Sequence, residues 1–236
     1  MVAAGSGTRF QASNRSGVRP PANVLAAPSD EPKQYLILGD RRVLDWSLTA
    51  ARRVAHRVIL AVAPDFAHIA EPGADAVVVG GSTRCESVRA ALAVVSPDTD
   101  AVVIHDAARP MATPELFQFV LEALTSGADA AIPGLGVSDT IKRVERREGS
   151  PAARVVATLD RSALVAVQTP QAFRREALVA AHAAGGEATD DAALVETAGG
   201  TVVVVAGEAG NIKLTTSDDL ALLRWRIAST TVTGQP

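Results

Sequence analysis

The sequence predicts an α/β fold with a mostly parallel sheet, and two observations lead to this prediction. Short β-branched runs at residues 58–62, 76–79 and 101–104 are apolar throughout, as strands covered on both faces are. Segments of helical length lie between these runs. Regular alternation of strands and helices is typical of a doubly wound sheet, so we predict a single domain over residues 1–236.

The helices between the strands are predicted at residues 43–54, 83–95 and 114–124. The third has Thr113 as its N-cap and Pro114 at its first position, where the missing N–H costs nothing. We expect Ser217 to cap a final helix, because two aspartates follow it in what would be the first turn.

A hairpin is predicted to interrupt the α/β pattern after residue 133. Residues 140–145 and 154–159 have strand character, and the segment between them is polar and contains a glycine. We therefore expect an extended β-arm at about residues 138–160. Residues 11–31 are polar and rich in Pro, Ser and Asn without any period, which predicts a mobile loop.

The first strand is unusually short for a parallel sheet of this kind. Only Met1 and Val2 precede the Gly-rich string that starts at Ala3. A short central strand leaves unpaired backbone on its neighbours and an apolar void. We therefore expect the natural chain to carry roughly four to eight further apolar residues before Met1.

Composition narrows the function classes. With 47% hydrophobic and 3% aromatic residues, the core must be built from Ala, Val and Leu. The net charge of -3 gives no reason to expect a nucleic acid or a membrane as partner. Cys85 is the single cysteine, no apolar run approaches a membrane span, and the four histidines lack metal-ligand spacing. We expect a cytoplasmic protein without a zinc site.

Lysine is scarce, and its positions attract attention. Of the 23 basic residues only Lys33, Lys142 and Lys213 are lysines. In a chain that uses Arg almost everywhere, the remaining lysines are expected where a compact ammonium group is required. Chance within an Arg-rich composition is the alternative interpretation.

Two Gly-containing segments are candidates for nucleotide binding. Residues 3–9 offer small residues whose N–H groups can approach phosphate oxygens, followed by Arg9. Residues 80–87 have Thr83 and Glu86 at capping-box spacing, and Ser87 could reach the edge of a base. The alternatives are a plain strand-to-helix turn for the first and an ordinary capped helix for the second.

Asp106 is the candidate metal ligand. It follows the apolar run at 101–104, so it should lie at the carboxyl end of the sheet, where open α/β folds bind ligands. A carboxylate that faces phosphates is most simply explained by a bridging Mg²⁺. A local ion pair with Arg109 is the alternative.

Eight segments, taken in order, resemble one known family, 2-C-methyl-D-erythritol 4-phosphate cytidylyltransferase of the non-mevalonate isoprenoid pathway. The resemblance is carried by residues 3–9, 32–34, 80–87, 105–110, 139–142, 168–171, 189–192 and 211–213. It implies a Rossmann-like nucleotidyltransferase fold, CTP as co-substrate, Mg²⁺, and a homodimer in which each arm reaches over the other subunit's active site.

The resemblance also implies a role for each matching residue. Lys33, Arg9 and Lys213 would be the catalytic cations, the first two at the α-phosphorus and Lys213 at a phosphate. Asp106 would hold Mg²⁺. The residues of the triphosphate cradle would be Ala3, Ala4, Gly5 and Gly7, and those that read cytosine Gly81 and Ser87. The residues that hold methylerythritol phosphate would be Ala107, Thr140, Arg161, Thr169 and Thr189, of which Thr140 and Arg161 come from the partner's arm.

Such a reaction needs cations rather than a general base, because the attacking phosphate is already an anion. Three other functions compete with this interpretation. Ribitol 5-phosphate cytidylyltransferase shares most of the motifs, and a non-catalytic nucleotide-binding homologue could keep the fold. A Rossmann dehydrogenase is disfavoured because Phe10 stands where a third glycine is required.

Overall fold

The computed structural model describes residues 1–3 and 32–232 of the chain. The predicted loop at 11–31 and residues 4–9 of the Gly-rich string lie outside the described residues. Within the described part, no helix combines the length and apolar character needed to cross a bilayer.

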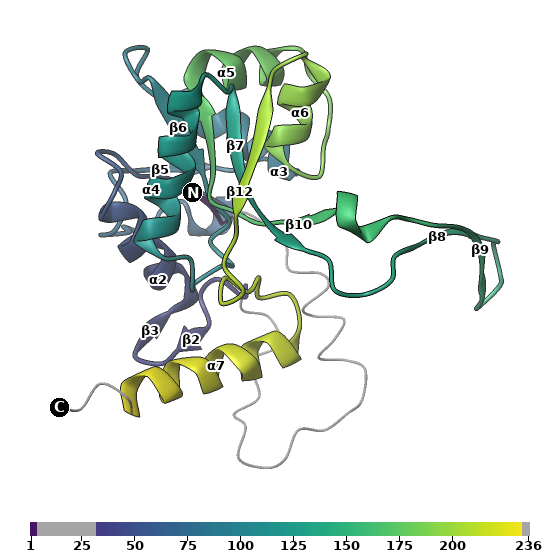
Figure 1. Cartoon of the computed structure of the whole chain (residues 1–236). Helices are drawn as coiled ribbons and strands as arrows, with labels where there is room; N and C mark the ends of the chain where they lie inside the picture. The colour runs from purple at the N-terminus through teal and green to yellow at the C-terminus, as the bar shows by residue number, and fades with distance from the viewer. Residues whose placement is uncertain (4–31, 233–236) are drawn as a thin grey trace.

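The centre of the molecule is a mixed, mostly parallel sheet with the order β5-β4-β1-β6-β11-β7-β12 (Figure 1). Its strands are β1 (Val2–Ala3), β4 (Ile59–Val62), β5 (Ala76–Val79), β6 (Ala101–Ile104), β7 (Ala130–Gly136), β10 (Val165–Val167), β11 (Gln171–Arg174) and β12 (Val202–Ala206). A parallel bridge between Val2 and Asp106 joins β1 to the β6 side. Only β11 and the short β10 run antiparallel to their neighbours in this sheet as described.

Helices cover both faces of the sheet (Figure 1). The helical elements are α2 (Val43–Arg52), α3 (Arg84–Leu92), α4 (Pro114–Ala123), α5 (Arg175–Ala183), α6 (Asp191–Thr197) and α7 (Ser217–Val232), with single 3₁₀ turns η1 (Pro64–Phe66), η2 (Leu124–Ser126) and η3 (Arg161–Ala163). The C-terminal α7 packs against the small hairpin of β2 (Ile37–Leu38) and β3 (Arg41–Arg42).

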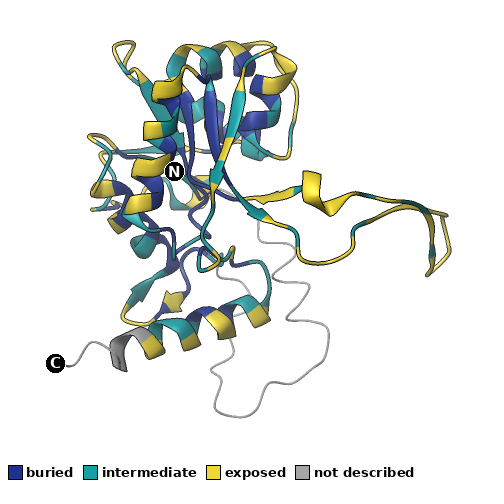
Figure 2. Ribbon diagram, in the orientation of Figure 1, coloured by how far each residue is buried: buried dark blue, intermediate teal, exposed yellow. Residues whose placement is uncertain are grey.

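The two faces have separate apolar cores. On one face Leu60 of β4 packs with Leu44 of α2. On the other, Phe173 of β11 packs with Leu178 of α5 and Val195 of α6. All five are buried, and Figure 2 shows the dark core running along the sheet strands. Continuous apolar strands therefore arise here because both of their faces are covered.

Most element predictions are confirmed, with shifts at the ends. β5 and β6 have the predicted bounds, whereas α2, α3 and α4 end one to three residues early, where helices commonly relax into turns. The Thr113 cap and the Thr83–Glu86 capping box are present. The cap of α7 is one residue earlier than expected: the Thr216 hydroxyl accepts the Asp219 N–H, and the Asp219 carboxylate accepts the Thr216 N–H.

The predicted hairpin forms the arm of the molecule. Strands β8 (Lys142–Arg146) and β9 (Ala153–Thr158) pair only with each other among the described strands, and they project from the body in Figure 1. Val144 and Val155 are large apolar side chains exposed on this arm. An isolated two-stranded hairpin is marginally stable in water, so this geometry is typical of a segment that contacts another surface.

A cavity lies beside the first strand. A cavity of about 560 Å³ lies next to Met1, between the first residues of β4 and β6 and the ends of α2 and α3. The Met1 ammonium group donates a hydrogen bond to the carbonyl oxygen of Ile59 at 2.7 Å, at the edge of this cavity.

Candidate active site

The candidate site is built around Asp106, at the carboxyl end of β6. The Asp106 N–H donates to Thr169 Oγ1 at 3.0 Å, and the next N–H, of Ala107, donates to the Val2 carbonyl at 3.0 Å. Both residues are buried, so the backbone on either side of the carboxylate is fixed to neighbouring segments. The carboxylate lies where open α/β sheets bind ligands, as predicted from the sequence.

Two cations hold the Asp106 carboxylate. Lys213 Nζ lies 2.6 Å from Oδ2, and Arg84 Nε lies 3.3 Å from Oδ1. Burial would raise the pKa of Asp106, but the charges of Lys213 and Arg84 outweigh it and hold that pKa well below its usual range. The alternative ion pair with Arg109 is not what the structure shows, since the Arg109 guanidinium donates to the carbonyl of Asn211 at 2.8 Å.

A hydrogen bond joins the segments that carry two of the scarce lysines. Lys33 Nζ donates to the carbonyl oxygen of Leu214 at 2.7 Å, and Leu214 follows Lys213 in the chain. The Leu214 N–H in turn donates to the Ala108 carbonyl at 2.8 Å. The segments that carry Lys33, Lys213 and Asp106 are therefore joined by hydrogen bonds, although they are far apart in the sequence.

The segment of Lys33 is also tied to the first strand, because the Gln34 side-chain amide donates to the carbonyl of Ala3. Ala3, the last described residue of the Gly-rich string, is therefore held by the residue that follows Lys33. The other members of that string with predicted roles, namely Ala4, Gly5, Gly7 and Arg9, lie outside the described residues.

Thr169 connects the site to the buried His105. Its hydroxyl lies 3.1 Å from His105 Nδ1, and its carbonyl accepts from the Asn211 side-chain amide at 2.8 Å. Burial lowers the pKa of His105 to about 4, although the Asp106 carboxylate opposes this shift. The ring is therefore neutral near pH 7, and through Thr169 it supports the backbone at Asp106.

The second Gly-containing loop forms a tight turn at the start of α3. The Gly81 N–H donates to Ser87 Oγ at 3.1 Å, and that hydroxyl donates to the Thr83 carbonyl at 2.9 Å. A Cβ at position 81 would lie 2.2 Å from Glu86 Cβ, so only glycine fits there. Ser87 is buried and already hydrogen-bonded, and a role of Gly81 and Ser87 with cytosine stays a prediction.

Three predicted substrate residues are not gathered around Asp106. Thr140 and Arg161 belong to the segments that lead into and out of the arm, and both are exposed. The Arg161 guanidinium donates to the carbonyl of Ser138, within the same region. Thr189 is exposed just before α6.

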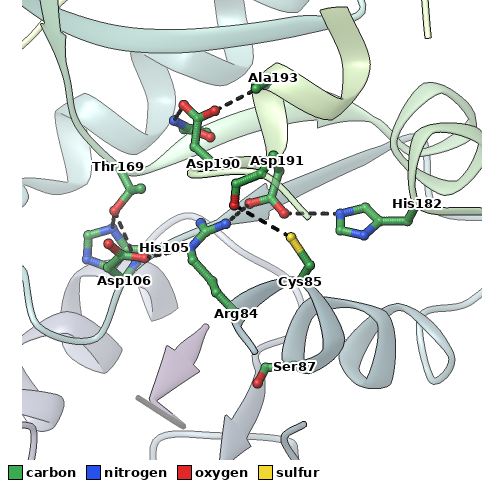
Figure 3. Close-up of polar contacts among 12 residues, drawn as sticks. Arg84, Cys85, Ser87, His105, Asp106, Thr169, His182, Asp190, Asp191 and Ala193 are labelled. Carbon is green, nitrogen blue, oxygen red and sulfur yellow. Dashed lines mark hydrogen bonds and ion pairs between the residues drawn. The ribbon is translucent and has the colours of Figure 1, made fainter. Parts of the chain in front are cut away.

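Sequence reasoning missed a charged network behind Asp106 (Figure 3). Besides its contact with Asp106, Arg84 places Nη1 2.5 Å from Asp191 Oδ2, and His182 Nε2 lies 3.0 Å from Asp191 Oδ1. The sequence gives only weak signs of this network. Arg84 is one arginine among many, and Asp190 and Asp191 stand out only as members of the segment 189–192.

The residues present fit a magnesium ion but not an all-protein metal cage. Among the described residues no group of three or more His, Cys, Asp or Glu side chains could hold a metal. Mg²⁺ is usually bound through one or two carboxylates together with substrate phosphates and waters. The single buried carboxylate of Asp106 meets that requirement when a nucleotide supplies the remaining oxygens.

Comparison with known proteins shows the family of this chain. The family model of 2-C-methyl-D-erythritol 4-phosphate cytidylyltransferase (IspD) matches residues 25–228. The protein of that name from Rhodococcus jostii is 42% identical over 201 residues, which cover 83% of this chain and 86% of that protein. The bifunctional enzyme IspD/IspF of Clavibacter michiganensis is 42% identical over 234 residues, covering 93% of this chain and 52% of that protein. The chain thus spans about half the length of this bifunctional relative, and 37% of that from Nitratidesulfovibrio vulgaris.

Solved structures of the same family resemble this chain. The 2-C-methyl-D-erythritol 4-phosphate cytidylyltransferase of Thermus thermophilus has a TM-score of 0.71 at 38% identity, covering 84% of this chain and 94% of that one. The 4-diphosphocytidyl-2C-methyl-D-erythritol synthase of Anaerococcus prevotii has a TM-score of 0.73 at 27% identity, covering 96% and 95%. These likenesses confirm the predicted nucleotidyltransferase fold.

Proposed function

The chain belongs to the 2-C-methyl-D-erythritol 4-phosphate cytidylyltransferase family, and from this premise we propose that it transfers a cytidylyl group from CTP to 2-C-methyl-D-erythritol 4-phosphate. The products are 4-diphosphocytidyl-2-C-methyl-D-erythritol and pyrophosphate. The observation that carries the proposal is the ion pair of Lys213 with Asp106 after β6, with Lys33 hydrogen-bonded to the residue that follows Lys213.

The chemistry of this step rests on positioning and charge. The attacking phosphate oxygen is already anionic, so the reaction needs cations that stabilise negative charge on the α-phosphorus rather than a base. Lys33 and Arg9 serve this purpose in the proposal. Lys213 has a half-exposed side chain and is placed to turn from Asp106 toward a phosphate, which a buried cation would not do.

Asp106 holds the Mg²⁺ in this proposal. Its carboxylate is anionic throughout the neutral range and is paired with Lys213. When bound, the metal supplies neutralisation of phosphate charge. The hydrogen bonds donated by the N–H groups of Asp106 and Ala107 fix the backbone on both sides of this carboxylate.

The remaining contacts follow from the same assignment. We assign Ala3, Ala4, Gly5 and Gly7 to the triphosphate, and Gly81 and Ser87 to cytosine. Five residues are assigned to methylerythritol phosphate: Ala107, Thr140, Arg161, Thr169 and Thr189. Ala107 and Thr169 are supported by their hydrogen bonds beside Asp106.

The arm supports a homodimer. Thr140 and Arg161 are carried by segments outside the body of their own subunit, and the hairpin exposes apolar side chains. Both facts are accounted for if each arm lies over the site of a second subunit. We further propose that residues 1–236 act as one domain in the cytoplasm, where the buried Cys85 stays reduced.

Pyrophosphate release tests the activity. The protein is incubated with CTP, Mg²⁺ and methylerythritol phosphate, with each substrate alone as control. Release that requires both substrates supports the proposal. Faster turnover with ribitol 5-phosphate would assign the rival reaction, and no release with either sugar phosphate would favour a non-catalytic homologue. Activity that survives removal of divalent cations with EDTA would contradict the role given to Mg²⁺.

A further inference from the structure

Arg84 lies between two carboxylates that come from distant parts of the chain. Its Nε is 3.3 Å from Asp106 Oδ1, and its Nη1 is 2.5 Å from Asp191 Oδ2. Figure 3 shows the guanidinium between them, at the start of α3. The planar fork of an arginine can engage two acceptors in fixed directions, which a lysine cannot do.

Of the two carboxylates, that of Asp191 is the more deeply buried. Asp191 has no exposed side-chain surface, and its Oδ1 is 3.0 Å from Nε2 of the buried His182. Burying a carboxylate this deeply is costly unless it is paired and hydrogen-bonded. Asp191 of α6 and His182 of α5 therefore form a buried pair that holds the guanidinium group of Arg84 in place.

Lys213, the partner of Asp106 Oδ2, differs from Arg84 in shape and in exposure. Lys213 is a single point charge on a flexible stem, and its side chain is 43% exposed, against 22% for Arg84. A ligand that enters from solvent meets Lys213 first. Asp106 thus has one exchangeable partner at Oδ2 and one fixed partner at Oδ1.

We propose that Arg84, anchored by Asp191, is a positioning residue that fixes the orientation of Asp106 for a divalent cation. The proposal rests on the proposed function, in which Asp106 holds the metal. When Lys213 turns toward a phosphate, Arg84 stays in place and prevents the carboxylate from rotating out of the site. Groups that orient a metal ligand from behind commonly change metal affinity by about 10- to 100-fold when they are altered.

The test compares Arg84→Lys with Arg89→Lys. Arg89 lies on the same helix and pairs with the exposed Glu187 at 3.2 Å, so the control makes the same chemical change away from Asp106. The binding of Mn²⁺ with CTP is measured by water-proton relaxation, together with the Mg²⁺ concentration that gives half-maximal velocity, kcat, and the KM for CTP. Asp106→Asn serves as the reference for a lost ligand.

We expect Arg84→Lys to weaken Mn²⁺ binding and to raise the half-maximal Mg²⁺ concentration by about tenfold or more, with the KM for CTP measured at saturating Mg²⁺ changed far less. Arg89→Lys should match the unaltered protein. Wild-type metal affinity in a folded Arg84→Lys protein would overturn the proposal.

Asp191→Asn provides a second line if Arg84→Lys does not fold. It removes the charge that anchors the guanidinium, and the metal affinity should fall in the same direction. If both single variants fold, their losses of metal affinity should not add in the Arg84→Lys/Asp191→Asn double variant, because both act through one network. A lower melting temperature without any change in Mn²⁺ binding would show that Asp191 only stabilises the fold. Failure of the unaltered protein to release pyrophosphate would overturn the proposed activity instead, while the Mn²⁺ comparison would still decide the role of Arg84.

Discussion

In a protein of residues 1–236 that begins at Met1, acetylation of the Met1 amine should stabilise the fold. The ammonium group donates to the Ile59 carbonyl at 2.7 Å beside an apolar cavity. Burial and the charge of Arg84 together lower its pKa from the ordinary 8.0 to about 6, although the charge of Asp106 opposes the shift. An acetylated Met1 keeps the N–H that Ile59 accepts but carries no charge, so the unfavourable burial of charge disappears.

The size of the effect follows from the two pKa values. Between pH 6 and pH 8 the unfolded chain binds more protons at this amine than the folded protein does, so stability rises with pH in this window. The rise is about 2 kcal/mol across the window, and the penalty that remains at pH 7 is about 1.4 kcal/mol. Acetylated protein should therefore be more stable by about 1.4 kcal/mol at pH 7, and the gain should fall below about 0.5 kcal/mol at pH 8.

Urea unfolding of the free and acetylated forms at pH 6, 7 and 8 measures this difference, with intact mass to prove the modification. The comparison at pH 9 is the internal control, because the free amine is then uncharged in both folded and unfolded chains. An equal gain at every pH would refute the reasoning, since it would reflect only the added methyl group. No gain at pH 7 would show that the ammonium group is hydrated.

Three further predictions concern catalysis and folding. Lys33→Arg should lower kcat by at least ~100-fold although charge is kept, because a forked guanidinium does not replace a compact ammonium group at a crowded phosphorus; near-normal turnover would disprove this. Mixing Arg161→Ala subunits with Lys33→Ala subunits should restore activity by forming one intact site per heterodimer; no recovery after proven subunit exchange would count against a shared site. Thr83→Ala removes the hydroxyl that accepts the Glu86 N–H at 3.1 Å and should cost about 1 kcal/mol in urea unfolding, whereas an unchanged midpoint would show that the cap adds nothing.

The strands and caps that the sequence predicted depend on local patterns. β5 and β6 are uninterrupted apolar runs, and Thr113 stands directly before a proline that can only begin a helix. β11 has no such pattern: Gln171 and Arg174 stand at its two ends. It is a strand because β6 and β7 pair with it on both sides, which is a tertiary cause that no local window contains.

In the site, too, some residues follow from local patterns in the sequence and others depend on tertiary contacts. Asp106 was predictable from the strand before it, and Lys213 from the scarcity of lysine. The role of Arg84 was not, because arginine is the common cation of this chain and its partner Asp191 lies 107 residues away. The acidity of Asp106 likewise depends on which cations the fold brings to it, and spacing along the chain does not encode that.

The exposed arm also has a consequence for turnover of the protein. Arg143, Arg146, Arg147 and Arg154 all lie exposed on it, on or next to strands that pair only with each other among those described. A trypsin-like protease should therefore cut a free subunit at the arm long before it cuts the body. If the arm is covered in the dimer, digestion rate becomes a measure of subunit dissociation, and dilution alone should hasten the loss of the arm.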